Sequence, residues 1–478
     1  MNRIKVFLLA LIVILGLWVR LYKIDNPVAD WHSFRQADTS SVTEEWLKHG
    51  VNVLAPAYQD HSNIQSGKDN PHGYRMVEFP VYNLLHYGVY KLDPGLGIDK
   101  AGRVTSVILS LISIVLIFLI GDRLSGFFVG FMAALFMAIL PFNIYYSRTI
   151  LPEPLTIVTV LASYFFLLLS AEKESKQRKL WFYLSAISLS ISILVKPYAI
   201  FFVLPHAALI FRLLVQQRLN ILDIFLYGGI ALGPFGWWRR HILSYPTGIP
   251  ASDWLLNSSG IRWRPAWFRW LFAERLGRLI LGIYGTIFLI LGLIAKPKHE
   301  GVAYWLWFIG ILTYFSVVAG GNVQHDYYQA IIIPFLTLIL AKGVSLVLSL
   351  STTTYSRWLT ILMTILSFGF MISLAWYDIE PYYHINNPAI IEAGKEVDRL
   401  TPKDALVIAP YNGDTAFLYQ TRRTGWPIGF YIEDKMSKGA TYYVSVVYDD
   451  EARSLEKQYT LVEKTDKFII IKLTPPAK

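Results

Sequence analysis

Long apolar segments recur along this chain and alternate with shorter polar connections. Most of them approach the 20 or so residues that a helix needs to cross the roughly 30 Å hydrocarbon core of a bilayer. The pattern therefore predicts an all-α polytopic membrane protein with about eleven transmembrane helices. These lie near residues 5–22, 104–121, 126–146, 154–171, 180–196, 198–215, 221–238, 277–295, 303–319, 328–349 and 357–376.

The first polar connection, residues 23–103, has a pattern of its own. Residues 39–49 place apolar side chains at helical spacing, with Thr39 in the position of an N-cap. Residues 79–92 are amphipathic and rich in aromatic side chains. We expect two helices here that lie on the outer membrane surface.

Beyond residue 376 the apolar positions follow a different period. The stretches "DALVIAPYN", "ATYYVSVVYDD", "YTLVEK" and "KFIIIKL" have the composition of β-strands, and an amphipathic helix is expected to open after Pro388. The sequence thus predicts a transmembrane domain over residues 1–376 and a small α/β domain over residues 377–478.

The charged loops predict the orientation in the membrane. If the N-terminus is cytoplasmic, the even-numbered loops, such as "AEKESKQRK" and "AKPKHEG", carry the Lys and Arg typical of cytoplasmic loops. The loop 23–103, the loop 239–276 and the C-terminal domain then lie outside. We expect a multi-pass protein of the plasma or inner membrane whose active site and C-terminal domain are extracytoplasmic.

The amino-acid composition also indicates a membrane protein. Hydrophobic residues make up 54% of the chain and charged residues only 16%, against roughly 25% charged in soluble domains. The net charge of +10 fits cytoplasmic Lys and Arg and contact with anionic membrane lipids rather than nucleic acid. The absence of cysteine excludes disulfides, thiolate metal ligands and a cysteine nucleophile.

The first outer loop contains two candidate general bases, Asp38 and Asp30. Their neighbours His32, Arg35 and Gln36 would set the pKa and orientation of such a carboxylate. Alternatively, Asp38 only starts a surface helix, where an acid offsets the helix dipole. Glu78 is a further outer acid, with either a structural role or a role at the acceptor.

Candidate cations for a phosphate lie in other outer loops. Arg148 suits bidentate phosphate binding, and Glu153 suits a sugar hydroxyl or a metal. A local ion pair at a helix end is the alternative for both. Lys196 is either a phosphate ligand or an interfacial lysine. Arg239 and Arg240 open an Arg- and Trp-rich loop that fits a phosphate beside a stacked sugar, or lipid headgroups.

The segment "NVQHDYYQ" places His325, Asp326 and Tyr327 at a helix end as candidate sugar or phosphate contacts. A divalent metal is one candidate cofactor, with Glu153 and His325 as candidate ligands. One histidine with one carboxylate is fewer ligands than a metal site needs.

The order of these features resembles the C-type (GT-C) glycosyltransferase superfamily, in particular the protein O-mannosyltransferase and aminoarabinose transferase branch, glycosyltransferase family 39. The resemblance covers residues 1–376 and is carried by "EFP", "PFNIYYSRTILPEPL", "LVKPYAIFF" and "HDYYQAIIIPFLTLILAKG". It implies an enzyme that moves a sugar from a polyprenyl-phosphate donor to an acceptor hydroxyl outside the cytoplasm, with inversion at the anomeric carbon. The acceptor would be a protein, a lipid or a glycan.

Carried over from the family, the base is an Asp of the first outer loop, here Asp38 or Asp30. The adjacent acidic pair usual in the family is absent, and "RQADT" occupies its place. Asp38 is the first choice because it is expected at the head of the surface helix.

The resemblance also assigns phosphate and sugar contacts. Arg148 and Glu153 match the family's second-loop position, and Glu78 matches the acid before its conserved proline. Phe79 stands where the family commonly has a phosphate-binding lysine. Phosphate binding is then left to Arg35, Arg148, Lys196, the arginines of residues 239–278, or a metal.

Two other functions compete with this one. A lipid-linked glycan flippase or transporter needs polar groups at the membrane midplane, which the one-sided distribution of polar residues does not favour. A catalytically silent membrane scaffold, whose tail binds partners, would account for the missing acidic pair.

Overall fold

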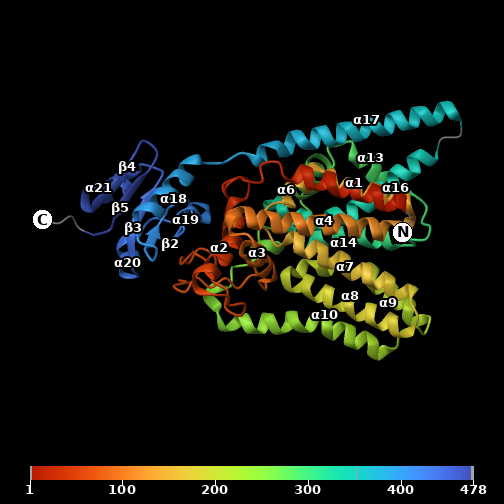
Figure 1. The fold of residues 1–478 in the computed structure, drawn as a ribbon, viewed down its shortest axis with the longest axis horizontal. Helices are drawn as coiled ribbons and strands as arrows, with labels where there is room; N and C mark the ends of the chain where they lie inside the picture. Colours follow the sequence, from red (N-terminus) through yellow and green to blue (C-terminus); the bar gives the residue numbers. More distant parts are fainter. Residues whose placement is uncertain (1–2, 351–352, 475–478) are drawn as a thin grey trace. The chain divides into compact units, whose positions relative to one another are not determined.

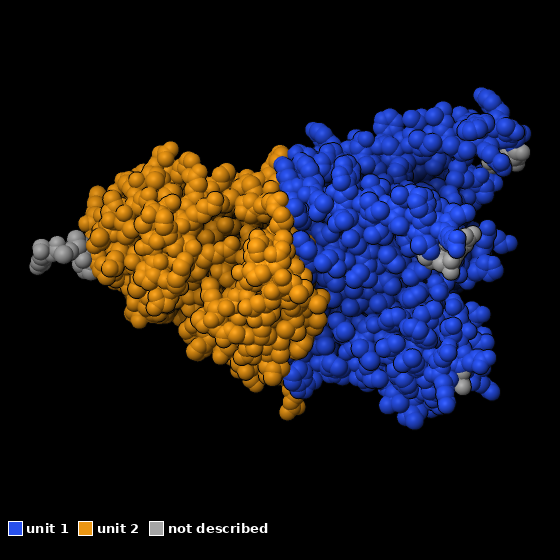
Figure 2. Space-filling view, in the orientation of Figure 1, with its two compact units in different colours: residues 1–24, 104–239, 252–381 blue, residues 25–103, 240–251, 382–478 orange. Residues whose placement is uncertain are grey.

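The computed structural model describes residues 3–350 and 353–474 (Figure 1). The chain divides into two compact units (Figure 2). Unit 1 consists of residues 1–24, 104–239 and 252–381, and unit 2 of residues 25–103, 240–251 and 382–478. Unit 2 thus joins the first long loop to the C-terminal part of the chain.

The described part of unit 1 is built from helices and their connections. The longer helices in which its residues lie are α1 (Arg3–Arg20), α4 (Gly97–Ser125), α5 (Phe127–Ile139), α7 (Glu153–Glu172), α8 (Ser175–Val195), α9 (Leu204–Val215), α10 (Ile221–His241), α13 (Gly285–Ile294), α14 (Ala303–Val317), α16 (Ile333–Ser349) and α17 (Thr354–Ile379). The shorter ones are α6 (Pro141–Tyr146), α11 (Asp253–Leu256), α12 (Pro265–Phe268) and α15 (Ala319–Gln324).

Six helices in the described residues are long and apolar enough to cross a membrane, or up to seven if a bent pair forms one span. Three shorter apolar helices, α5, α9 and α14, accompany them. The predicted membrane protein with many apolar helices is confirmed, whereas its count of about eleven spans stays a prediction.

The bent pair corrects the expectation of one continuous helix over residues 277–295. A π-helical segment, Arg269–Ile280, is followed by a break, and α13 starts only at Gly285. The chain bends by 113° between the helical segments Pro265–Ile280 and Gly285–Ile294. Gly282 makes this turn: its φ is +48°, and a Cβ there would lie 2.0 Å from the carbonyl oxygen of Met371. Glycine alone tolerates both conditions.

Unit 2 contains the predicted α/β fold. Its helices are α18 (Pro388–Leu400), α19 (Thr415–Gln420), α20 (Ile432–Ser437) and α21 (Asp450–Gln458), and its strands are β1 (Leu406–Ile408), β2 (Thr424–Trp426), β3 (Ala440–Ser445), β4 (Thr460–Lys464) and β5 (Ile469–Lys472). The strand order is β2-β1-β3-β5-β4. β1 is parallel to β2 and β3, and β5 is antiparallel to β3 and β4.

One apolar core of this fold includes a residue from the first loop. Ala29 is fully buried together with Ile390, Val407 and Phe417, from α18, β1 and α19. The segment just before the candidate bases is therefore part of the packing of the C-terminal fold.

The first loop forms two helices, α2 (Ser33–His49) and α3 (Val81–Leu92). The prediction that α2 starts near Thr39 is wrong, because the helix begins at Ser33 after His32, which is left-handed at φ 53°. Almost every position from Ser33 to Trp46 is buried, so α2 is an internal helix of unit 2 and not one lying on a surface. Its polar residues hide the helical period from a hydrophobicity pattern.

Candidate functional site

Asp30 lies in the connection before α2, and its side chain is fully buried. Its Oδ1 accepts a hydrogen bond of 2.7 Å from Nε2 of Gln36, in the first turn of α2. Its Oδ2 lies 3.1 Å from a guanidinium nitrogen of Arg103, in the second turn of α4. The amide and the guanidinium orient the carboxylate, and the positive charge offsets part of the cost of burying it. An oriented carboxylate meets the first requirement for a general base.

Asp38 is in the second turn of α2, not at its head as predicted. Its Oδ1 accepts a 2.7 Å hydrogen bond from the Thr415 hydroxyl. Its Oδ2 lies 2.9 Å from the Arg75 guanidinium and accepts a 3.1 Å hydrogen bond from the Gln65 amide. These contacts join α2 to the loop before α3 and to α19. Asp38 therefore has the surroundings of a carboxylate that holds three segments together.

The other candidates of the first loop lie in the same unit. Arg35 forms an ion pair with Glu78, and both side chains are largely buried. His32 is half-buried, with its ring in edge contact with those of Trp31 and Phe34. Glu78 thus balances the charge of Arg35, and His32 packs among aromatic rings.

Two further acids of unit 2 are placed close to Asp38. Burial raises the pKa of Asp60 to about 6, and the negative charge of Asp38 adds to the rise. Burial likewise raises the pKa of Asp414 to about 6, again with a contribution from Asp38. Both acids cap backbone N–H groups, Asp60 that of Ser62 and Asp414 that of Ala416. Two carboxyls close to Asp38 therefore change charge near pH 6.

Unit 1 contains the predicted phosphate-binding cations Arg148 and Lys196, both buried. Arg148 donates a 2.8 Å hydrogen bond to the carbonyl of Lys23, and its guanidinium lies 5.4 Å from the ring centre of Tyr145. Lys196 follows the last residue of α8 and lies 3.1 Å from the carboxylate of Glu153, the first residue of α7. Glu153 is thus in an ion pair, but its partner Lys196 lies 43 residues further along the chain and not beside it as the local ion pair of the alternative would require.

The segment around residue 326 also lies in unit 1. Asp326 is buried, and its Oδ1 accepts a 2.5 Å hydrogen bond from the Tyr146 hydroxyl. Its Oδ2 lies 3.4 Å from the guanidinium of Arg275. The ring of half-buried His325 stacks on that of Tyr327 at 5.5 Å. Asp326 is therefore held by two side chains from distant parts of the sequence.

The remaining two candidates, Arg239 and Arg240, are exposed at the end of α10. Of the candidate metal ligands, Glu153 pairs with Lys196 and His325 stacks on the ring of Tyr327. Throughout residues 3–350 and 353–474, no three or more His, Asp or Glu side chains group closely enough to hold a metal ion.

Sequence reasoning missed Arg103, Arg75 and Thr415 as partners of the candidate bases. Arg103 directly precedes a predicted transmembrane segment, where a basic residue is usually taken as an interface anchor. No pattern marked Arg75 or Thr415, because their partner Asp38 is 37 and 377 residues away in sequence, respectively.

The comparisons with known proteins bear on the fold and the class. A family model described as dolichyl-phosphate-mannose-protein mannosyltransferase matches residues 80–237. A search of curated proteins found no match. The predicted resemblance to the mannosyltransferase branch is confirmed by this family model over the residues that it matches.

Solved structures share the fold. ArnT from Cupriavidus metallidurans bound to undecaprenyl phosphate is similar with a TM-score of 0.66 and 14% identity over 97% of both chains. The archaeal oligosaccharyltransferase AglB from Archaeoglobus fulgidus, in complex with an inhibitory peptide and dolichol-phosphate, has a TM-score of 0.62 and 10% identity. That match covers 93% of this chain and 69% of AglB. At such identities the likeness shows the fold.

Proposed function

We propose that this membrane glycosyltransferase, similar to the dolichyl-phosphate-mannose-protein mannosyltransferases, transfers a sugar from a polyprenyl phosphate to an acceptor hydroxyl on the extracytoplasmic side, with Asp30 as the base. The observation that carries the proposal is the buried Asp30 carboxylate, oriented by Gln36 and Arg103. The undecaprenyl phosphate in the structure of ArnT, which has the same fold, supports the choice of donor.

The transfer is a single displacement. The acceptor oxygen attacks C1 of the sugar, and the bond between C1 and the phosphate oxygen breaks. The phosphate leaves with the bonding electron pair as polyprenyl phosphate, while the acceptor proton passes to an Asp30 oxygen. Attack on the side opposite the leaving group inverts the anomeric carbon.

Asp30 fits the role of base better than Asp38, which was preferred from the sequence. The contacts of Asp30 run to α2 and α4. Asp38 instead accepts hydrogen bonds from Thr415 and Gln65 and pairs with Arg75, so it joins α2 to α19 and to the loop before α3. Its preference rested on a helix start that α2 does not have. Asp30 precedes the helix, and its carboxylate is fixed by two donors.

We assign stabilisation of the leaving phosphate to Arg148 and Lys196 of unit 1. Both are buried, and a buried cation acts on a developing negative charge more strongly than an exposed one. The exposed Arg239 and Arg240 are better suited to lipid headgroups. We assign no step to a metal ion. The acceptor class, whether protein, lipid or glycan, is left to experiment.

The test uses the full-length protein in lipid nanodiscs, with synthetic undecaprenyl-phosphate monosaccharides as donors and a cell-envelope extract as acceptor. Released undecaprenyl phosphate is quantified by mass spectrometry. Asp30→Asn should lower turnover by about 10²–10⁴-fold, the usual contribution of a general base. Its binding of undecaprenyl phosphate should stay unchanged.

Asp38→Asn is the matched control and should keep most of the turnover per folded molecule. Loss of activity in Asp38→Asn with full activity in Asp30→Asn would move the base to Asp38. Full activity in both variants would contradict base catalysis by either acid. In a deletion strain, a monosaccharide missing from the envelope glycans would identify the sugar.

A further inference from the structure

The segment that carries Asp30 runs beside the start of the C-terminal region. The Trp31 N–H donates to the Tyr382 carbonyl at 3.1 Å, and the Asn386 N–H donates to the Ala29 carbonyl at 2.8 Å. The Asn386 amide also donates to the Asp30 carbonyl at 3.0 Å. The backbone on both sides of the candidate base is therefore hydrogen-bonded to residues 382–386.

Two side chains contact the backbone of Val28, and one of them belongs to the C-terminal α/β fold. Its N–H lies 3.4 Å from Oδ2 of Asp99, and its carbonyl accepts a 2.9 Å hydrogen bond from Nε2 of Gln420, the last residue of α19. Val28 is fully buried, and Gln420 is only 9% exposed. Because water is excluded there, the Val28 carbonyl depends on this protein donor.

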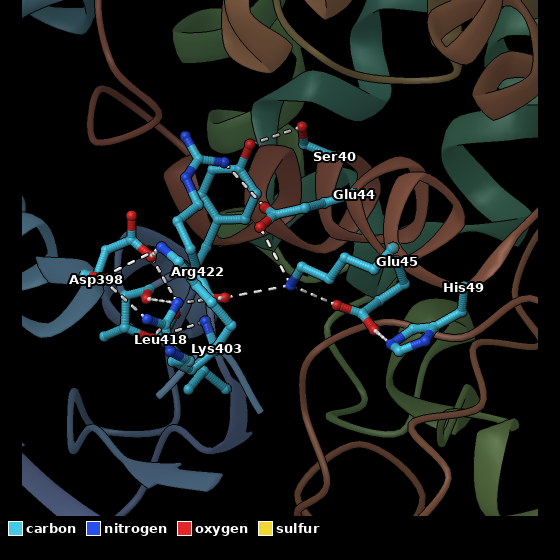
Figure 3. A network of polar contacts seen from close by, with 12 residues as sticks. Ser40, Glu44, Glu45, His49, Asp398, Lys403, Leu418 and Arg422 are labelled. Carbon is cyan, nitrogen blue, oxygen red and sulfur yellow. Dashed lines mark hydrogen bonds and ion pairs between the residues drawn. The ribbon is translucent and has the colours of Figure 1, made fainter. Parts of the chain in front are cut away.

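Buried residues of α2 are bonded to the same part of the C-terminal fold. Tyr419 shares a 2.9 Å hydrogen bond with Ser40, and Arg422 lies 2.9 Å from Glu44. Figure 3 shows this network of contacts between α2 and the residues around Arg422. The helix and the segment before it are thus both fixed to α19 and the turn that follows it.

We propose that the C-terminal α/β fold positions the base, and that Gln420 is its positioning residue. This inference rests on the proposed function, in which Asp30 takes the acceptor proton. Gln420 holds the Val28 carbonyl two residues before Asp30, while Ala29 between them is packed in the α/β core. The fold thereby fixes the position from which the Asp30 carboxylate takes the acceptor proton. Misplacement by about 1 Å can lower a rate by about 10²-fold.

The experiment compares Gln420→Met, which keeps the side-chain length without the donor, with Gln420→Ala. The control is Gln458→Ala on α21, whose exposed amide donates to Ser454 at 2.9 Å. Full-length variants in nanodiscs are assayed with undecaprenyl-phosphate monosaccharides, and the folded fraction is determined for each. Asp30→Asn is measured in parallel.

We expect kcat per folded molecule to fall at least about tenfold in both Gln420 variants. The KM for the donor and the binding of undecaprenyl phosphate should stay within about twofold, and the acid limb of the pH profile of kcat should shift, because the surroundings of the base change. Gln458→Ala should behave like the wild type. A purely structural role would lower the yield of folded protein without changing kcat or the pH profile.

The two proposals fail in different ways. If Asp30→Asn is inactive while both Gln420 variants turn over like the wild type, only the positioning role is overturned. If Asp30→Asn is fully active, the base assignment is overturned, and the positioning role falls with it.

Discussion

Asp30 and Arg103 form an ion pair of 3.1 Å in which neither side chain is exposed to solvent. The pair joins the connection before α2 to the start of α4, which are 73 residues apart in sequence. Such a pair is costly to bury and costly to break, because removing one partner leaves an uncompensated charge in a low dielectric. The contribution of this ion pair to the free energy of unfolding can therefore be measured apart from turnover.

Replacing Arg103 by Met should destabilise the protein by about 3–5 kcal/mol, the usual cost of removing one partner of a buried ion pair. The double variant Asp30→Asn with Arg103→Met should regain much of this loss, because no charge is then left unpaired. Thermal unfolding in detergent, followed for the wild type, both single variants and the double variant, measures the coupling. Additive effects of the two substitutions would contradict the buried pair.

Lys196 and Glu153 provide a second test, because their ion pair has two interpretations. If Lys196 also binds the lipid phosphate, Lys196→Met should weaken the binding of undecaprenyl phosphate by about tenfold or more, the range of one hydrogen bond to a charged group. Glu153→Gln should not weaken it, because it removes a competing anion. Native mass spectrometry of the variants in nanodiscs measures both affinities.

A purely structural pair gives a different pattern. Both variants would then unfold at lower temperature, and their folded fractions would bind undecaprenyl phosphate like the wild type. That result would remove Lys196 from the set of phosphate ligands.

The sequence predicted those parts of the fold that depend on local pattern. Apolar runs predicted a chain with many apolar helices, though not the break before Gly285, and the alternating segments after residue 400 predicted strands β1, β3, β4 and β5. It missed the start of α2, since polar residues at buried positions leave no apolar stripe to mark a helical period. It also missed β2, which has only three residues, Thr424–Trp426.

For the candidate site, too, the sequence predicted some residues and missed others. Asp30, Asp38, Arg148 and Lys196 could be selected as polar residues next to apolar segments. Their partners could not be selected, because Arg103, Arg75 and Thr415 reach them only through tertiary contacts. The order of preference between Asp38 and Asp30 depended on one helix boundary, which is the least reliable feature of a pattern.

Close packing of α13 on α16 gives a prediction about stability. A Cβ on Gly343 of α16 would lie 1.9 Å from the Phe288 carbonyl oxygen, and one on Gly292 of α13 would lie 2.0 Å from that of Ile339. Small residues let membrane helices approach this closely. Gly343→Ala should therefore lower stability by about 1–3 kcal/mol or more through overpacking.

The control for this packing is Gly369→Ala on α17, where an added Cβ meets nothing within 4 Å. That change should be neutral or slightly stabilising, because alanine favours a helix over glycine by up to about 1 kcal/mol. Thermal unfolding in detergent distinguishes the two. Equal unfolding temperatures would contradict the close approach of the two helices.

Asp60 gives a prediction about pH. It accepts hydrogen bonds from the Ser62 N–H at 2.7 Å and from the Tyr58 hydroxyl at 3.2 Å, and it is 1% exposed. Because burial raises its pKa to about 6, the folded protein binds a proton more tightly than the unfolded chain does. The stabilisation from that proton is complete below the unfolded pKa of about 4 and is lost as the pH rises through about 6.

Asp60→Asn imitates the protonated acid at every pH, since an amide oxygen can accept from the Ser62 N–H. The variant should therefore be more stable than the wild type at pH 7.5, by up to about 3 kcal/mol for a shift of about two pKa units. This difference should be much smaller at pH 4.5 and should vanish below the unfolded pKa of about 4. His61, whose pKa burial lowers to about 4, titrates in both proteins and cancels in the difference.

Asp404→Asn, at an exposed position, is the control, and its difference from the wild type should not change between pH 4.5 and pH 7.5. Unfolding temperatures at pH 4.5, 6 and 7.5 provide the measurement, and a difference independent of pH would show that Asp60 is ionised in the folded protein throughout this range.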